Sequence, residues 1–183
     1  MVRAMLIYPK HQMVSIFPCN IKVNKMNNGS PGMFILAMWR KLSPWPGGSF
    51  LFSFLLSYTV PYSGTLGARI IKLQPGSSHI RLKDRRKVRN HLRSIHAVAI
   101  TNFGELASGL ALLTGLPTNV RGIVIKITTE YLVKARGDLT ATCHCQPPEV
   151  NTDLDYHVKA TIKNEQHQDV AIVSIVWRLS PFR

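Results

Sequence analysis

Acidic residues are missing from the first 83 positions, and the first acid of the chain is Asp84. Residues 1–83 contain ten lysines and arginines, whereas residues 84–183 contain thirteen against nine acids, so most of the net charge of +14 lies in the N-terminal part. A basic segment without acids attracts anions such as phosphates, nucleic acid or an acidic membrane surface. The charge alone does not discriminate among these partners.

Cysteine is scarce as well. Cys19, Cys143 and Cys145 are too few and too unevenly spaced for a disulfide scaffold, so we expect a reducing, cytoplasmic location. In a strand, Cys143 and Cys145 would share one face and His144 would point to the other. Because no second cysteine pair accompanies them, we expect no metal and interpret both as small packed hydrophobic side chains.

Long uninterrupted apolar runs are also absent. The longest, residues 50–60, is broken by Ser53 and Ser57 and is too short to span a bilayer, so no transmembrane segment is expected. Residues 1–32 are basic and acid-free, and we interpret them as an N-terminal extension that is disordered or serves in targeting. A transit segment there would make the location mitochondrial. Residues 33–183 are expected to form one domain.

Apolar periodicity and turn residues predict an α+β protein. Helices are expected at 33–42, 48–60 and 95–114, and strands at 66–73, 77–83, 122–133, 138–145, 156–163 and 170–179. Strands joined by short turns favour an antiparallel sheet. The helix at 95–114 is apolar nearly all round and must be covered on most sides, which a strongly curved sheet wrapped around it would achieve.

One acidic residue, Glu105, interrupts that apolar helix. A carboxylate is rarely buried unless it is paired or used, because removing its charge from water is costly. His96 stands nine positions upstream, and Asn90 stands six positions before His96. A carboxylate in apolar surroundings can act as a base, and the free N–H groups of a helix start can stabilise an oxyanion.

The pattern Asn90-x5-His96-Ala97 followed by Glu105 resembles the hotdog-fold acyl-CoA thioesterases. It is most similar to the phenylacetyl-CoA-thioesterase-like branch, which has Asn, then His-Gly-Gly, then Asp at the same two spacings. Residues 130–137, Glu-Tyr-Leu-Val-Lys-Ala-Arg-Gly, resemble the strand of that family that ends in a Tyr-x-x-Pro-Ala-x-Gly turn. The resemblance covers residues 33–181 and looks like an uncharacterised branch, a domain of unknown function.

The resemblance implies a role for each residue. Glu105 would be the nucleophile or general base, Asn90 would hold substrate or water, and His96 with the backbone amide of Ala97 would polarise the thioester carbonyl. The chain departs from the pattern in having Ala97 in place of Gly and Glu105 in place of Asp. It also has Val124 where relatives often carry a serine or threonine that supports the water.

The spacing of His96 and Glu105 has a geometric consequence. Nine helical residues amount to two and a half turns, so two helical residues at this spacing face opposite sides, about 13.5 Å apart along the axis. One chain could not easily bring both to one site. A site shared across a homodimer, or a dimer of dimers, is therefore expected, as the resemblance also implies.

A dense basic run precedes the proposed site. Its members are Lys83, Arg85, Arg86, Lys87, Arg89 and Arg93, and Lys134 and Arg136 have the same character. Such a run is usually a solvated surface. We expect the substrate and its CoA to be bound by Arg85, Arg86, Arg89, Lys134, Arg136 and Gly137. The basic side chains would meet the CoA phosphates or an acidic carrier protein.

The sequence thus predicts hydrolysis of an acyl-CoA thioester to free acid and CoA, with no cofactor besides the substrate. A non-catalytic module that binds acyl-CoA or an acyl carrier is the first alternative. Binding of nucleic acid or an anionic membrane surface is a third interpretation that rests on net charge only. Nucleic acid is not expected as a partner, because no interleaving of aromatic and basic residues supports it.

Overall fold

The computed structural model describes residues 30–182. The N-terminal extension predicted at 1–32 therefore lies outside the described residues except for its last three positions. Helix α1 (Pro31–Leu42) begins within those positions, because Ser30 caps it by accepting a hydrogen bond from the Met33 amide and Pro31 occupies its first turn. Helix α2 (Gly48–Thr59) follows the left-handed Gly47, at φ 77°.

Among the described residues, six strands form one antiparallel sheet. They are β1 (Arg69–Gln74), β2 (Ser77–Leu82), β3 (Val120–Tyr131), β4 (Leu139–His144), β5 (Leu154–Lys163) and β6 (Asp169–Pro181), in the spatial order β1-β2-β4-β5-β6-β3. Strands β1 and β3 are the two edges. All five neighbouring pairs are antiparallel, which confirms the sheet expected from the short turns.

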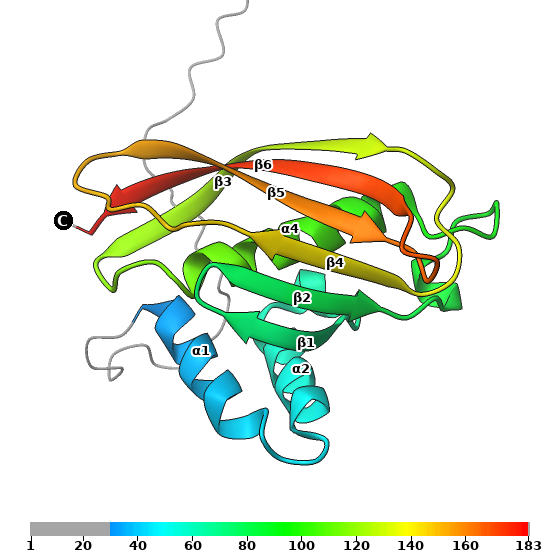
Figure 1. The fold of residues 1–183 in the computed structure, drawn as a ribbon, viewed down its shortest axis with the longest axis horizontal. Coiled ribbons are helices and arrows are strands. Elements are labelled where there is room, and N and C mark those ends of the chain that lie inside the picture. Colours follow the sequence, from blue (N-terminus) through cyan, green and yellow to red (C-terminus); the bar gives the residue numbers. More distant parts are fainter. Residues whose placement is uncertain (1–29, 183) are drawn as a thin grey trace, which may run out of the picture.

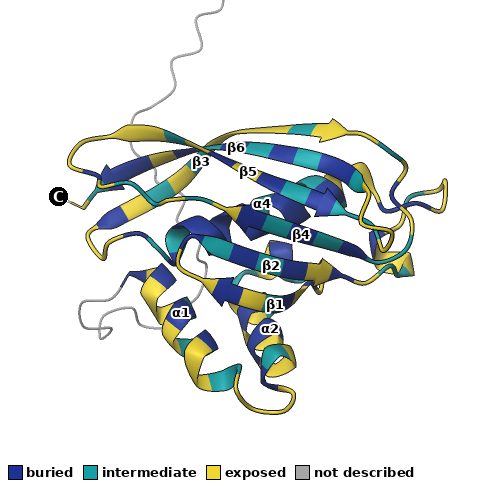
Figure 2. Ribbon diagram, viewed as in Figure 1, coloured by how far each residue is buried: buried dark blue, intermediate teal, exposed yellow. Residues whose placement is uncertain are grey.

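Helix α4 (Ala97–Leu113) lies against the inner face of the curved sheet (Figure 1). Its buried face carries Phe103, Ala107 and Ala111, all fully buried. Figure 2 shows buried residues along much of α4 and buried residues alternating with others along the strands. Two glycines allow close packing on β6: Gly104 faces Val173 and Gly109 faces the Trp177 ring. This is the α+β arrangement predicted from the apolar helix, a curved antiparallel sheet wrapped around a long central helix.

Two further short elements were not predicted. Helix α3 (Pro61–Gly64) is a single turn after α2, and the turn η2 (Arg86–Val88) lies within the basic run. The helices α1 and α2 project from the β1 edge of the sheet (Figure 1). Within residues 30–182, none of the helices has both the length and the apolar character that a membrane crossing requires.

Strand β3 contains a bulge at Ile125. Val124 pairs with Trp177, whereas Lys126 pairs with Val176, so one extra residue stands on the β3 side. Before the bulge Val124 faces α4, and after it the odd-numbered residues Ile127, Thr129 and Tyr131 do so, opposite inward-facing residues of β6.

Candidate active site

One face of α4 is left uncovered by the other described residues, 30–182. Val98, Thr101, Asn102 and Glu105 share that face by helical spacing, and none of them is buried. Asn102 accepts a hydrogen bond from the Ser63 hydroxyl of α3 at 2.9 Å. The N-terminal half of α4 therefore exposes a strip between α3 on one side and β3 on the other.

The carboxylate of Glu105 lies half-buried in this strip. Burial raises the pKa of the Glu105 carboxyl above its usual value, and desolvation is the cause. Within residues 30–182, no hydrogen bond or ion pair involves this carboxylate; the Ser108 hydroxyl donates only to the backbone carbonyl of Glu105. A partly desolvated carboxyl without a partner is a typical feature of a functional site.

His96 lies at the start of the same helix but is not helical. Its φ of −65° and ψ of 138° make it the N-cap residue, so the expectation of a helix from residue 95 is corrected to a start at Ala97. The His96 Nδ1 accepts a hydrogen bond from the Val98 amide at 3.1 Å. In the neutral ring the proton then resides on Nε2, which remains a donor.

The backbone around His96 is held by neighbouring loops. The His96 amide donates to the Val88 carbonyl at 2.8 Å, and the Ile95 amide donates to the Ala135 carbonyl at 2.9 Å. Ala97 is exposed and is the first helical residue, where N–H groups have no partner in the helix. Ala97 and Glu105 are eight residues apart, or about 12 Å along the axis.

Asn90 organises the loop before His96. Its Oδ1 accepts hydrogen bonds from the amides of Leu92 and Ser94, at 2.9 and 3.1 Å, and from the Ser94 hydroxyl at 3.2 Å. This is an Asx turn that fixes the approach to the helix. Only the Nδ2 amide group of Asn90 remains for the substrate contact that the sequence predicted.

A group of hydroxyls beside Glu105 was not predicted from the sequence. The Thr101 hydroxyl lies 2.9 Å from the hydroxyls of both Thr129 and Tyr131, and Tyr131 donates to the Ala97 carbonyl at 3.0 Å. Thr101 stands one turn before Glu105. The family position expected at Val124 lacks a hydroxyl, but the bulge in β3 turns Thr129 and Tyr131 toward the helix.

Three of the six predicted CoA-binding residues, Arg85, Arg89 and Gly137, instead contact other residues of the chain. The Arg85 guanidinium donates to the carbonyls of Thr65 and Leu66, and Arg89 forms an ion pair of 2.6 Å with Asp84. The Arg89 guanidinium lowers the pKa of the Asp84 carboxyl. The Gly137 amide also donates to Asp84, at 3.1 Å, so this carboxylate joins the two loops.

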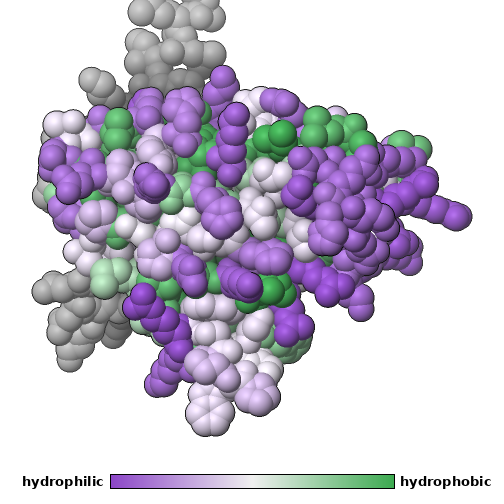
Figure 3. Space-filling model, viewed as in Figure 1, coloured by the Kyte–Doolittle hydropathy of each residue, from purple (hydrophilic) through white to green (hydrophobic). Residues whose placement is uncertain are grey.

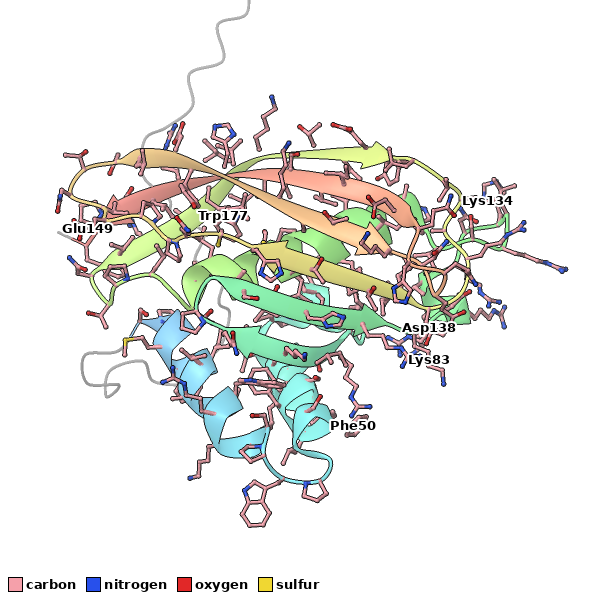
Figure 4. The ribbon with its side chains drawn as sticks, in the orientation of Figure 1. Phe50, Lys83, Lys134, Asp138, Glu149 and Trp177 are labelled. Carbon is pink, nitrogen blue, oxygen red and sulfur yellow. The ribbon has the colours of Figure 1, made fainter. Side chains whose placement is uncertain are left out.

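The other three, Arg86, Lys134 and Arg136, are exposed and make no side-chain hydrogen bond or ion pair within the described part of the chain. Lys83 and Lys134 are labelled at the same end of the molecule in Figure 4, and that end is strongly hydrophilic in Figure 3. Because the Ile95–Ala135 hydrogen bond joins the loops that carry them, this basic end adjoins the N-terminus of α4.

Two hollows among the described residues lie away from this site. One lies between α2, α3 and β1 and the other between α1 and β1, and neither is lined by His96 or Glu105. Cys143 is buried on the inner side of β4, while His144 is exposed and its Nδ1 lies 3.0 Å from the Ser77 hydroxyl. Among residues 30–182, no group of three or more His, Cys, Asp or Glu is placed to hold a metal ion.

A curved antiparallel sheet wrapped around one long helix is the arrangement of the hotdog fold. The chain belongs to the family described as domain of unknown function (DUF4442), whose model matches residues 48–179. This confirms the resemblance to an uncharacterised thioesterase-like branch. No curated protein matches the chain.

Solved structures share the fold. The crystal structure titled genomics APC5556 is 26% identical, with a TM-score of 0.70, over 81% of this chain and 99% of that chain. A protein of unknown function from Pseudomonas aeruginosa, PA5026, titled a probable thioesterase, is 20% identical, with a TM-score of 0.65, over 72% and 95%. A hypothetical thioesterase from Streptococcus pneumoniae, solved with coenzyme A, is 17% identical, with a TM-score of 0.54, over 63% and 88%.

Proposed function

We propose that the protein hydrolyses an acyl-CoA thioester to a free acid and CoA, at an active site shared between two copies of the chain. The observation that carries the proposal is the Glu105 carboxyl, which is half-buried on the uncovered face of α4, has a raised pKa and has no partner among the described residues. Such a carboxylate is suited to take a proton from water near neutral pH.

The groups at the start of α4 complement this base. The Ala97 N–H and the His96 Nε2–H would donate to the thioester carbonyl oxygen and stabilise the negative charge that develops there. Glu105, as base, would take a proton from a water whose oxygen attacks the carbonyl carbon. When the C–S bond breaks, the thiolate of CoA receives that proton, and the acid is released.

A second copy is required because the base and the oxyanion donors of one chain are about 12 Å apart along α4. Strand β3 offers a surface for that copy. It is a 12-residue edge strand that flanks the Glu105 strip, and its isoleucines at 123, 125 and 127 are 40–45% exposed. Long exposed edge strands readily pair with another strand, and twofold pairing of β3 would cover the strip.

The nucleotide part of CoA would bind at the basic end. Arg86, Lys134 and Arg136 are free to meet phosphates there, next to the N-terminus of α4. The pneumococcal protein of the same fold was solved with coenzyme A, which supports this choice of carrier. The engaged Arg85, Arg89 and Gly137 would instead hold the loops in place.

The proposal is tested by incubating the purified full chain with acyl-CoAs of varied chain length and head group while monitoring release of the free thiol. Turnover of at least one acyl class, lost in Glu105→Gln, is expected. Saturable acyl-CoA binding without turnover would contradict hydrolysis and support the alternative, a non-catalytic acyl-CoA-binding module. Absence of both binding and turnover across the series would overturn the proposal.

A further inference from the structure

A row of exposed aromatic side chains runs along α2 and its flanking turns. The row, here called the aromatic ridge, consists of Trp45, Phe50, Phe54, Tyr58 and Tyr62, which are 62–79% exposed. Phe50, Phe54 and Tyr58 follow one another at intervals of four and therefore share one side of the helix. The opposite side carries Phe52 and Leu56, which are buried against the body of the protein.

Helices α2 and α1 carry further exposed apolar side chains. Leu51 and Leu55 of α2 are 47% and 38% exposed, and Met33 and Phe34 of α1 are each 48% exposed. The α1–α2 pair projects from the β1 edge, and Phe50 is labelled on this projection, on a different part of the molecule from Lys134 of the basic end (Figure 4). Exposed aromatic and aliphatic side chains grouped on one helix are typical of an interaction site.

Charges around the aromatic ridge are of one sign. Arg40 and Lys41 occupy the last turn of α1, just before Trp45. Arg69 of β1 donates to the Ser49 hydroxyl in the first turn of α2, at 3.3 Å, and Lys72 of β1 is exposed. No acidic residue occurs before Asp84, so the segments that form this surface combine apolar side chains with cations and contain no carboxylate.

We propose that the aromatic ridge docks the protein on a bilayer that contains anionic phospholipid. The charges favour lipid over a second copy of the chain. A twofold contact through the ridge would bring Arg40, Lys41 and Arg69 toward their own copies, and the α1–α2 region has no carboxylate to compensate them. An anionic lipid surface supplies both the negative charge and an apolar layer.

The residue types fit an interfacial position. Tryptophan and tyrosine place an apolar ring and a polar tip at the boundary between headgroups and acyl chains, and phenylalanine enters the apolar layer. Cations beside the surface add attraction to anionic lipid that falls with salt. Helix α2 would lie in the plane of the interface, which gives reversible binding. This inference does not depend on the proposed hydrolysis.

Sedimentation with vesicles tests the proposal on the full chain. Vesicles of phosphatidylcholine alone are compared with vesicles that also contain phosphatidylglycerol, at low and high salt. We expect binding to the anionic vesicles only, weakened by salt. The double variant Phe50→Ser/Phe54→Ser should bind at least about tenfold more weakly, and Arg40→Gln/Lys41→Gln should lose roughly fivefold per cation.

Two matched variants control for general loss of apolar surface or charge. Leu154→Ser/Phe182→Ser removes two exposed apolar side chains elsewhere, and Arg121→Gln/Lys159→Gln removes two exposed cations elsewhere. Both should bind vesicles like the unaltered protein. All changed side chains are exposed, and far-ultraviolet circular dichroism verifies that each variant remains folded.

Tryptophan fluorescence gives a readout specific to the ridge. Of the three tryptophans, Trp45 is 72% exposed, whereas Trp39 and Trp177 are 8% and 4% exposed. Anionic vesicles should therefore shift the emission to shorter wavelength and protect it from iodide, and Trp45→Phe should abolish both effects.

Three results would overturn the proposal. The first is no binding to anionic vesicles at low salt. The second is binding that survives Phe50→Ser/Phe54→Ser but is lost when Arg86, Lys134 and Arg136 are neutralised, since the basic end would then be the lipid contact. The third is protection of Trp45 from iodide in the free protein, because the ridge would then already be covered by the chain itself or by a second copy.

Discussion

The imidazole of His96 accepts the amide hydrogen of Val98 at 3.1 Å and thereby caps the helix that carries Glu105. This hydrogen bond assigns the ring proton of neutral His96 to Nε2. The same contact thus stabilises the start of α4 and prepares a donor beside the Ala97 amide. His96 can therefore cap the helix and also serve as the proposed hydrogen-bond donor to the substrate.

Replacement of Glu105 tests the base directly. Glu105→Gln removes the proton acceptor and should reduce kcat by at least about 100-fold. In the unaltered protein, kcat/KM should rise with pH through a midpoint above the usual glutamate pKa, because desolvation raises the pKa of Glu105 and the proposed base acts in its ionised form. Steady-state rates across pH measure both effects. Glu149→Gln, at an exposed acid far from the basic end (Figure 4), should behave normally.

The substitution Glu105→Gln should raise stability although it should lower kcat. Because the folded pKa is raised, stability is highest below the unfolded pKa and falls as pH rises through the folded pKa, since the unfolded chain ionises first. Glu105→Gln should therefore raise the free energy of unfolding near neutral pH by on the order of 1 kcal/mol. The gain should shrink near pH ~4. Urea unfolding at the two pH values measures it, and an equal gain at both would contradict the desolvation of Glu105.

Subunit mixing tests the shared site. His96→Ala and Glu105→Gln should each be inactive, but a hybrid dimer contains one site with both native groups. Equal mixing with full exchange should therefore restore about one quarter of the native rate, from half of the dimers with one of two sites intact. Native mass spectrometry verifies exchange. If hybrid dimers form but show no activity, then either His96 and Glu105 act in the same chain's site or one of them takes no part in the reaction.

Neutralisation of the basic end should affect binding of the nucleotide. Arg86→Gln/Lys134→Gln/Arg136→Gln should raise KM for acyl-CoA about tenfold or more while KM for the matching acyl-pantetheine changes little. Arg85→Gln should instead lower stability by about 1–3 kcal/mol, because it removes a guanidinium that binds the Thr65 and Leu66 carbonyls. An unchanged KM for acyl-CoA in the triple variant would refute the phosphate site.

Two glycines of α4 provide a matched test of the packing. A Cβ at Gly104 would overlap the Val173 side chain, so Gly104→Ala should cost about 1–3 kcal/mol of stability. A Cβ at Gly109 would meet the Trp177 ring at 3.4 Å, an ordinary contact, so Gly109→Ala should be neutral or stabilise by up to about 1 kcal/mol. Thermal unfolding of both variants measures the difference. Equal effects would mean that α4 does not approach β6 as described.

The long elements were predictable because their signals are local. The alternation of apolar and polar residues at 156–163 indicates a strand, and Gly115 and Pro117 indicate where the long helix ends. Neither signal needs tertiary information, and the structure agrees with both to within a few residues. Helix α3 was missed because a proline usually ends a helix, and the helix predicted at 48–60 stops directly before Pro61. In fact Pro61 occupies the first turn of a new four-residue helix.

The site was predictable in part. The spacing of His96, Ala97 and Glu105 identified one helix and its start, but not the cap that removes His96 from the helix. Arg85 could not be recognised as internal, since its acceptors lie 19 and 20 residues away at Leu66 and Thr65. The hydroxyl group around Thr101 depends on a strand register that only the folded sheet defines.

The bulge at Ile125 decides which side chains of β3 face α4 on the side of Glu105. If Ile125 paired regularly instead of bulging, strict alternation from Val124 would place Thr128 and Glu130 on the side of α4 in place of Thr129 and Tyr131. The Tyr131 hydroxyl beside the Glu105 strip would then be exchanged for a second carboxylate without any change of residue type. In related chains, insertions and deletions in this strand are therefore as informative about chemistry as substitutions.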